Sequence, residues 1–449
     1  MKRVLVANRG EIAVRVVRAC RALGLESVVA VSEADRDSMA AQMADRAVCI
    51  GPAKPALSYL NRDAVLAAAL GTGADAVHPG YGFLAENAAF AEGCERQGLT
   101  FVGPRSETVR SMGNKLAARE AARHSGVPLV AGSDHVRAFE NARAIAGEIG
   151  YPVLFKAAAG GGGRGIRIVH AERDLEQAFR GAAAEAGAAF GDPTLYLERY
   201  ITTGRHIEVQ VISDRGGRVV HLGERDCSLQ RRYQKVVEEA PAAAVPEAAR
   251  DAIRRSAVLL AEAIGYENAG TVEFLYDEQR DEHYFLEMNT RIQVEHPVTE
   301  MITGLDLVRL QLQVAGGDPL PLTQEQVTFT GHAIECRINA ESPEQGFRPS
   351  PGRITRWAPP EGPGVRLDTH CYEGYVVPPF YDSLLGKLIV HGKDRTEALA
   401  RTKAALRTFE VEGVATTIPF HSWLLDQPDI AAGRFGTRWL EGRLAEFTG

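Results

Sequence analysis

Apolar segments of strand type alternate with amphipathic helical segments through the first 113 residues. Strands are expected at RVLVAN, SVVAVS, DAVHPG and LTFVG, and helices at residues 11–23, 62–70 and 86–97. Strands that alternate with helices in this way are typical of parallel α/β units. The pattern therefore predicts a Rossmann-like parallel α/β domain over residues 1–113.

The pattern changes after residue 113 to a helix, a glycine loop and a hairpin, up to about residue 203. A mixed sheet with HIEVQVIS and TVEFLY follows, and a stretch rich in Pro and Gly at 342–364 leads into a last segment that ends in the helical ARTKAALRTF. A chain of 449 residues is too long for one core. We expect two to four domains of the α/β and α+β classes.

A run of small residues stands between two strand-like segments in KAAAGGGGRGIRIV, residues 156–169. It is not a P-loop, because that motif places its Lys after the glycines and continues into a helix. The string GTGADA at 71–76 precedes a strand and does not follow one, so it is no dinucleotide fingerprint. A glycine-rich hairpin that brings bare backbone close to phosphates fits the run, and a flexible linker is the alternative.

The composition argues against a nucleic-acid-binding, a secreted or a membrane-spanning protein. The net charge is −7, which argues against a nucleic-acid surface. Six cysteines lie apart without a C-x-x-C pair, as reduced and mostly buried thiols do in a cytosol. The start MKRVLVANRG does not fit a signal peptide, and no apolar run is long enough to span a bilayer.

Polar and apolar residues alternate in FLEMNTRIQVEHPVTE, where Glu287, Asn289, Arg291, Gln293 and Glu295 share one parity. On one straight strand they would share a face and spread over roughly 26 Å, at ~3.3 Å per residue. That is too far for one reaction centre. We therefore expect the chain to curl after about Thr290, which would make two neighbouring clusters.

A hairpin centred near residues 279–280 would place Glu273 close to opposite Glu287. Two like charges directly across a ladder repel. Mg²⁺ or Mn²⁺ would neutralise them, with Asn289 as a further oxygen ligand and phosphates to complete the site. The alternative is a solvated sheet face.

The chain at this point resembles biotin carboxylase, a member of the ATP-grasp family. Motifs in family order carry the resemblance over essentially the whole chain: ANRGEIA at 7–13, HPGYGFLAEN at 78–87, MGNK at 112–115, the glycine run, ERDCSLQRRYQK at 224–235, EMNTRIQVEHPVTE at 287–300, GHAIECRINAE at 331–341 and PPFYDSLLGKL at 378–388. The resemblance implies an N-terminal α/β domain (1–113), an ATP-grasp domain (114–330) with a mobile glycine-rich lid at about 131–203, and a C-terminal α+β domain (331–449).

The resemblance also implies roles for particular residues. Glu295 would be the general base, and the bicarbonate cradle would consist of Lys235, Arg291, Gln293 and the backbone at Val294. Arg337 would face the ureido oxygen of biotin, and Glu273, Glu287 and Asn289 would hold the metal. The implied ATP contacts are Lys115, Lys156, the flap glycines Gly161, Gly162 and Gly163, Glu198, His206, Gln230 and Tyr233.

Each of these residues has an ordinary alternative. Lys115 and Lys156 could be surface lysines, His206 a satisfied core histidine and Arg337 a structural ion pair. The sequence also departs from the family pattern. It has Ala158-Ala159 at the base of the flap where Ser-Gly is usual, and Tyr233 where many relatives have His or another polar residue. We expect these departures to change the affinity for the nucleotide and not the reaction that is catalysed.

The resemblance implies a ligase that carboxylates biotin through carboxyphosphate, using ATP and bicarbonate. This carboxylation of biotin is the first half-reaction of an acyl-CoA carboxylase, and the resemblance favours one that acts on acetyl-CoA. The chain has no Met-Lys-Met site for covalent biotin. We therefore expect a separate biotin carboxyl carrier protein. The resemblance also implies carboxyltransferase subunits and a homodimer, and the cysteine usage indicates the cytoplasm. The alternatives are another ATP-grasp ligase, such as half of a carbamoyl-phosphate synthetase, and an inactive nucleotide-binding regulator.

Overall fold

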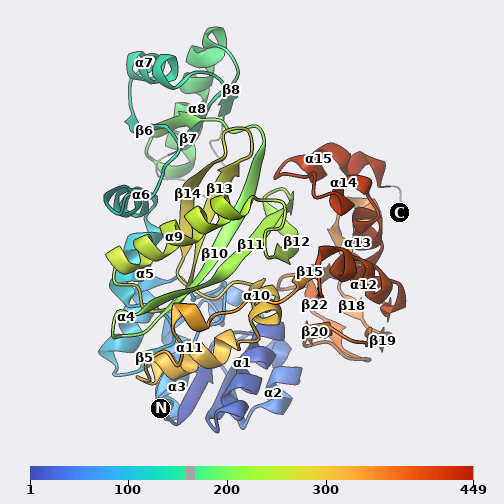
Figure 1. The fold of residues 1–449 in the computed structure, drawn as a ribbon. Coiled ribbons are helices and arrows are strands. Elements are labelled where there is room, and N and C mark those ends of the chain that lie inside the picture. Colours follow the sequence, from blue (N-terminus) through green and yellow to red (C-terminus); the bar gives the residue numbers. More distant parts are fainter. Residues whose placement is uncertain (158–166, 448–449) are drawn as a thin grey trace.

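The structure is a computed structural model that describes residues 1–157 and 167–447. The glycine run from residue 158 to 166, with the predicted contacts Gly161, Gly162 and Gly163 and the pair Ala158-Ala159, lies outside the described residues. Figure 1 shows three regions: an N-terminal α/β layer at the bottom, long central strands with a smaller α/β lobe above them, and the C-terminal helices at the right. The α/β and α+β classes predicted from the sequence are confirmed.

The N-terminal region is a five-stranded parallel sheet in the order β3-β2-β1-β4-β5. Its side chains alternate between two cores. Val4 and Val6 pack against one cluster, and Leu5 packs against the other. The strands are β1 (Arg3–Val6), β2 (Glu26–Val31), β3 (Arg46–Cys49), β4 (Ala76–His78) and β5 (Thr100–Phe101), and the helices are α1 (Gly10–Ala22), α2 (Met39–Met43), α3 (Arg62–Gly71), α4 (Ala88–Arg96) and α5 (Ser106–Gly113).

The predicted helices lie within one or two residues of those observed. α4 begins at Ala88 rather than at residue 86, because the side chain of Asn87 accepts a hydrogen bond from the backbone N–H of Phe90 at 2.9 Å and caps the helix. The short helices α2 and α5 were not predicted.

The upper lobe is a four-stranded antiparallel sheet in the order β6-β9-β7-β8, with its own apolar core. β7 and β8 are the two strands that flank the glycine run, and they pair as a hairpin. The strands are β6 (Gly132–Val136), β7 (Val153–Ala157), β8 (Arg167–Val169) and β9 (Leu195–Arg199), and the helices are α7 (Phe139–Ile149) and α8 (Leu175–Phe190). The helix before the lobe, α6 (Lys115–His124), packs on the core of the central sheet.

The central sheet has eight antiparallel strands in the order β14-β13-β10-β11-β12-β15-β22-β20. It is continuous across residue 330, because β12 pairs with β15. The strands are β10 (Gly204–Ser213), β11 (Val219–Arg231), β12 (Gln234–Ala240), β13 (Asn268–Asp277), β14 (Glu282–Asn289), β15 (His332–Asn339), β20 (Val365–Thr369) and β22 (Leu384–Gly392), and the helices after β12 are α9 (Glu247–Ala263), α10 (His296–Thr303) and α11 (Leu307–Ala315).

The chain does not end with the predicted helix ARTKAALRTF. That segment lies in α12 (Arg395–Thr408), and further helices pack beyond it on the core that covers the outer face of β15 and β22. The remaining elements are β16 (Glu341–Ser342), β17 (Arg348–Pro349), β18 (Gly352–Arg353), β19 (Arg356–Ala358), β21 (Val376–Val377), β23 (Glu410–Glu412), α13 (Ile418–Leu425), α14 (Pro428–Ala431) and α15 (Trp439–Arg443).

All six cysteines are free, as the scattered spacing predicts, and only Cys49 is exposed. In the part of the chain that the structure describes, no helix has both the length and the apolarity to cross a membrane.

Candidate active site

The polar ladder of the sequence divides into two neighbouring clusters, as predicted. β14 ends at Asn289, and residues 290–295 turn away from the sheet before α10 begins at His296. Glu273 and Glu287 are Cα partners on β13 and β14, and the register slips by one residue directly beside them. Such a bulge next to a functional site redirects the side chains.

Glu273 is the centre of the first cluster. Its Oε1 accepts hydrogen bonds from Asn289 Nδ2 at 2.8 Å and Gln293 Nε2 at 3.0 Å, and lies 3.1 Å from Nζ of Lys235. Its Oε2 lies 3.0 Å from Nε2 of His206. Burial alone would raise the pKa of Glu273, but the charges of Lys235 and His206 lower it. Glu273 is therefore a carboxylate in the resting protein.

The opposed carboxyl group of Glu287 has a different environment. It is open to solvent, yet the surrounding protein and the nearby charge of Glu273 raise its pKa above the ordinary value, while Lys115 opposes the rise. Two opposed carboxylates and an amide oxygen are the donor set that Mg²⁺ and Mn²⁺ take in proteins, so these residues fit a divalent cation. His206, Glu208 and Glu273 also place possible ligand atoms within 4.8 Å of one another.

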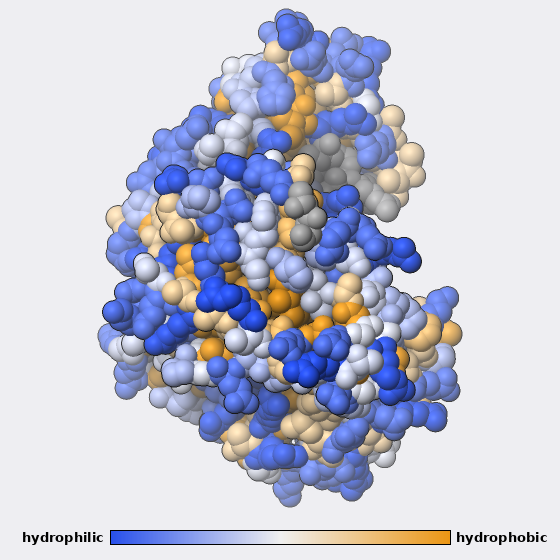
Figure 2. All heavy atoms as spheres, turned by 90° about the vertical axis from the view of Figure 1, so that its right-hand side faces the viewer, coloured by the Kyte–Doolittle hydropathy of each residue, from blue (hydrophilic) through white to orange (hydrophobic). Residues whose placement is uncertain are grey.

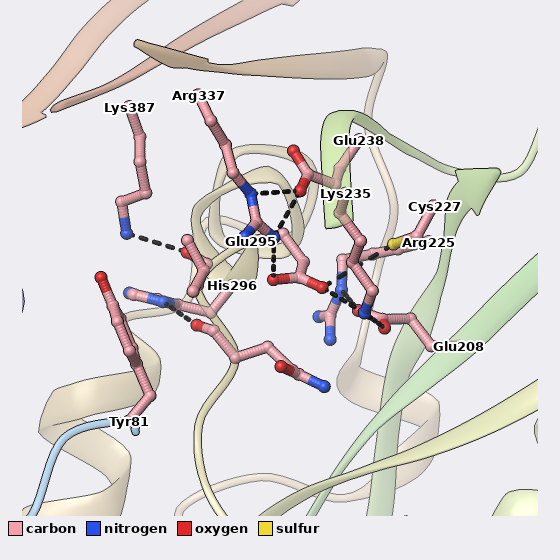
Figure 3. Close-up of polar contacts among 12 residues, drawn as sticks. Tyr81, Glu208, Arg225, Cys227, Lys235, Glu238, Glu295, His296, Arg337 and Lys387 are labelled. Atoms are coloured by element: carbon pink, nitrogen blue, oxygen red, sulfur yellow. Dashed lines mark hydrogen bonds and ion pairs between the residues drawn. The ribbon is translucent and has the colours of Figure 1, made fainter. Parts of the chain in front are cut away.

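The second cluster is built around Glu295, which is wholly buried. Its Oε1 lies 2.6 Å from Lys235 Nζ and its Oε2 lies 3.0 Å from Nη2 of Arg337 (Figure 3). Burial by itself would raise the pKa of Glu295, but the charges of Lys235, Arg337 and Arg225 together hold it well below its usual range. The candidate base is therefore ionised.

Arg291 lies at the junction of the two clusters. Its Nη1 donates to Gln293 Oε1 at 2.7 Å, its Nη2 donates to Asn289 Oδ1 at 3.1 Å, and its Nε donates to Glu86 Oε2 at 2.9 Å. Glu86 comes from the N-terminal region, so the cation is fixed from two directions. The predicted group Lys235, Arg291, Gln293 and Glu295 is thus brought together in one place.

Several charged residues of the site were not predicted from the sequence. Glu208 on β10 accepts from Lys235 and from the fully buried Arg225, each at 2.5 Å. Arg225 also reaches Thr299 of α10 at 2.9 Å, so it ties the sheet to the helix that follows Glu295. The sequence does contain a signal for Glu208. His206, Glu208 and Gln210 alternate with apolar residues in a predicted strand, which puts three polar side chains on one face.

A second unpredicted group supports the backbone at Val294. Nζ of the fully buried Lys387 donates to the Val294 carbonyl at 2.8 Å and lies 3.0 Å from Oε1 of Glu11. Tyr81 donates to the same Glu11 oxygen. Glu11 and Tyr81 also line a cavity of about 430 Å³ between the N-terminal and C-terminal regions, whose other walls include Phe83, Phe380 and Tyr381.

The predicted nucleotide contacts occupy several elements. Nζ of Lys156 on β7 pairs with Glu198 on β9 and lies 5.5 Å from the ring centroid of Tyr196. His206 Nδ1 is 3.1 Å from Nε2 of Gln230, in the first cluster. The exposed Lys115 is the first residue of α6.

Tyr233 lies apart from these side chains. It stands at the tip of the β11–β12 hairpin with a φ of +65° and 75 % of its surface exposed. Its contact with a ribose stays a prediction.

One face of the molecule has a mixed character. Figure 2 shows hydrophobic residues gathered at mid-height, below the grey atoms, in a face that is otherwise mainly hydrophilic.

Comparisons with known proteins cover nearly the whole chain. Three family models match: "Biotin carboxylase, N-terminal domain" at residues 1–109, "Carbamoyl-phosphate synthase L chain, ATP binding domain" at 114–323 and "Biotin carboxylase C-terminal domain" at 335–442. Biotin carboxylase 1 of Bacillus subtilis is 53 % identical over 98 % of both chains. A pyruvate carboxylase subunit of Methanothermobacter thermautotrophicus is 50 % identical over 98 % of this chain and 89 % of its own.

A solved structure is also similar over nearly the whole chain. The biotin carboxylase domain dimer of Hydrogenobacter thermophilus 2-oxoglutarate carboxylase, in complex with MgADP, ADP and bicarbonate, has a TM-score of 0.90 and 49 % identity, and the match covers 98 % of this chain and 97 % of that one.

Proposed function

The chain belongs to the biotin carboxylase family, and we propose that the residues around Glu273 and Glu295 carry out its ATP-dependent carboxylation of biotin with bicarbonate. The observation that carries the assignment of residues is the position of Lys235. Its Nζ lies 3.1 Å from Glu273 in the cluster that fits a metal and a nucleotide, and 2.6 Å from Glu295 in the cluster that fits bicarbonate. One cation therefore joins the two reactants' sites.

Bicarbonate is a poor nucleophile until it loses its proton. Glu295 is ionised and can accept that proton, but the cations that hold it ionised also make it a weak base. A bicarbonate ion bound between Lys235 and Arg291 would draw Lys235 away from Glu295. The pKa of Glu295 would then rise, which makes the carboxylate a stronger base when the substrate is in place.

The deprotonated oxygen attacks the γ-phosphorus of ATP, and ADP leaves, so that carboxyphosphate forms. Lys156, Lys115 and the glycine run are proposed to hold the ATP phosphates, with Glu198, His206, Gln230 and Tyr233 around the nucleoside. Glu273, Glu287 and Asn289 would hold Mg²⁺ or Mn²⁺, which when bound supplies positive charge to the transferring phosphoryl group.

Biotin enters the reaction after this step. Carboxyphosphate breaks down to CO₂ and phosphate, the phosphate takes the N1 proton of biotin, and the N1 nitrogen then attacks CO₂. Arg337 would donate to the ureido oxygen, where negative charge develops once the proton has left. Nη2 of Arg337 can do this only if it turns from Glu295, which lies 3.0 Å away, and from Oε1 of Glu238, which lies 2.5 Å away.

The three regions divide this work in the proposal. Residues 1–113 and 331–449 enclose biotin, and residues 114–330 bind ATP and bicarbonate. Biotin would arrive on a separate carrier protein through the 430 Å³ cavity, whose wall contains Glu11 and Tyr81 beside the Lys387 support of Val294. A homodimer in the cytoplasm that serves carboxyltransferase subunits of an acetyl-CoA carboxylase completes the proposal.

An isotope experiment tests the route through carboxyphosphate. Bicarbonate labelled with ¹⁸O should transfer one labelled oxygen to inorganic phosphate in each turnover, because the oxygen that attacks ATP stays on phosphorus. Phosphate without label, formed at the same rate as carboxybiotin, would refute the route. ADP formation that proceeds equally with ammonia in place of biotin would favour the carbamoyl-phosphate alternative.

A further inference from the structure

Two wholly buried glutamates face each other on the strands that carry Lys235 and Arg337. Glu238 on β12 and Glu335 on β15 are Cα partners in the register of the sheet, and both have 0 % exposure. Directly opposed residues point to the same face of a sheet, and so do residues two apart on one strand. Arg337 therefore shares its face with both carboxyl groups. The reaction steps above use neither of the two.

The two carboxyl groups have unequal hydrogen bonding. Oε1 of Glu238 accepts from Nε of Arg337 at 2.6 Å, and Oε2 of Glu238 has no hydrogen-bond partner among the described residues. Both oxygens of Glu335 lack a partner within residues 1–157 and 167–447. A carboxylate that is buried without hydrogen bonds is strongly disfavoured relative to its neutral form.

The neighbouring cations are already bonded to other acceptors. Arg337 on β15 is shared by Glu238 and Glu295. Lys235 on β12 contacts Glu208, Glu273 and Glu295. Lys387 on β22 contacts Glu11 and the Val294 carbonyl.

The imidazole of His296, at the start of the covering helix α10, adds no positive charge. Burial and the nearby charge of Lys387 hold its pKa well below the usual range. Arg337, Lys235 and Lys387 are therefore each bonded to acceptors other than Glu335.

The electrostatics of the pair agree with this geometry. Burial raises the pKa of Glu335 well above its ordinary value, and the charges of Glu238 and Glu295 add to the rise while Lys387 and Arg337 oppose it. Burial also raises the pKa of Glu238, although the guanidinium of Arg337 pulls it down. Carboxyl groups that share a site are prevented from ionising together.

We propose that Glu335 and Glu238 hold one proton between them, with the proton on Glu335, and that the charged Glu238 anchors Arg337 for the biotin half-reaction. The inference rests on the proposed role of Arg337. Nε stays on Glu238, while Nη2, which lies 2.5 Å from Glu238 and 3.0 Å from Glu295, turns to the ureido oxygen of biotin. Glu335 is a positioning residue: a second negative charge beside Glu238 would hold the guanidinium back from biotin.

The first test measures the proton itself. Infrared spectra of the wild-type enzyme at pH 7 should contain the carbonyl band of a buried protonated carboxyl group. The difference spectrum between the wild type and Glu335→Gln should contain this band, and the difference spectrum for the matched control Glu373→Gln, which removes an exposed carboxylate, should lack it. A difference spectrum for Glu335→Gln without the band would overturn the proposal.

The pH dependence of stability gives a second measurement. A carboxyl group whose pKa is raised by folding binds more protons in the folded state, so it lowers stability as pH rises above the ordinary range of glutamate. From about pH 5 to about pH 9, Glu335→Gln should therefore gain stability relative to the wild type, and Glu373→Gln should follow the wild type. Loss of stability or of folding in Glu335→Gln at all pH values would mean that Glu335 is ionised and neutralises Lys387, which contradicts the proposal.

The anchoring role is tested through Glu238. In Glu238→Gln, the hydrogen bond from Arg337 loses its charged acceptor, and kcat/KM for biotin should fall about 10- to 100-fold, the range expected for hydrogen bonds to charged groups. Bicarbonate-dependent ATP hydrolysis without biotin should fall much less, and Glu238→Asp should recover part of the loss. Equal losses in both reactions would refute the anchor. A wild-type enzyme without bicarbonate-dependent turnover would refute the proposed function instead, and the infrared band would still test the proton.

Discussion

Replacement of Arg337 by alanine should separate the two half-reactions. Its guanidinium contacts Glu238 through Nε at 2.6 Å and Glu295 through Nη2 at 3.0 Å, and 20 % of the side chain is exposed. In the proposed mechanism it acts after biotin has lost its proton, and the loss of one such donor typically costs about 10²–10³ in rate. We therefore expect carboxybiotin formation to fall by about that factor, and ATP hydrolysis without biotin to fall far less.

The same change should lower stability. It leaves the wholly buried Glu238 without its hydrogen-bond donor, and removal of one partner from a buried ion pair typically costs about 3–5 kcal/mol. It also removes a positive charge that lowers the pKa of Glu295, so the acid limb of the pH profile for ATP hydrolysis should move to higher pH. Arg337→Lys should recover part of the stability, because a single ammonium group can neutralise one of the two carboxylates.

The assay follows both reactions and the melting temperature in Arg337→Ala, Arg337→Lys and the control Arg348→Ala, which removes an exposed arginine. Rates are compared only under conditions in which each variant is folded. Parallel losses in the two reactions together with a lowered melting temperature would show that Arg337 is a structural ion pair, and the catalytic reasoning would then be wrong.

Three further outcomes are expected. Glu295→Gln should lower turnover by roughly 10²–10⁴ in a bicarbonate-dependent ATP assay if Glu295 is the base, and a rate near that of the wild type would move this role to another residue. Burial alone would raise the pKa of Glu239, but hydrogen bonds from His332 and Arg395 lower it to about 2. This contributes about 3 kcal/mol above the ordinary glutamate pKa, so the stability gap between wild type and Glu239→Gln in urea should shrink as pH falls toward 2, and a constant gap would contradict the assignment. Streptavidin blotting should find no covalent biotin on this chain, because the sequence lacks a lysine between two methionines, and a labelled band at its mass would disprove the need for a separate carrier.

Local patterns predicted much of the fold and part of the site. Alternating strands and helices indicated the parallel N-terminal sheet, and the polar turn between β13 and β14 predicted that Glu273 opposes Glu287. The alternation after Glu287 predicted the curl that separates the two clusters. These features depend on periodicity over a few residues, which a sequence displays directly.

Long-range pairing left no comparable signal. The pairing of β12 with β15 joins residues about 100 positions apart, and it alone places Glu238 opposite Glu335. Lys387 and Glu11 meet because β22 adds to the same sheet and α1 packs against it, so neither was assigned a role from the sequence. Glu208 lies in the predicted strand HIEVQVIS and Arg225 in the motif ERDCSLQRRYQK. Neither was assigned a role, because only the packed sheet shows which charges they neutralise.

The central claim is that one continuous site joins ATP cleavage to the carboxylation of biotin. The most direct test measures ADP formation by the purified chain with Mg²⁺ and ATP, with and without bicarbonate and with and without free biotin. We expect little ADP when bicarbonate is removed, slow formation when it is present, and a clear increase when biotin is added. Equal rates of ADP formation in all four conditions would contradict the claim.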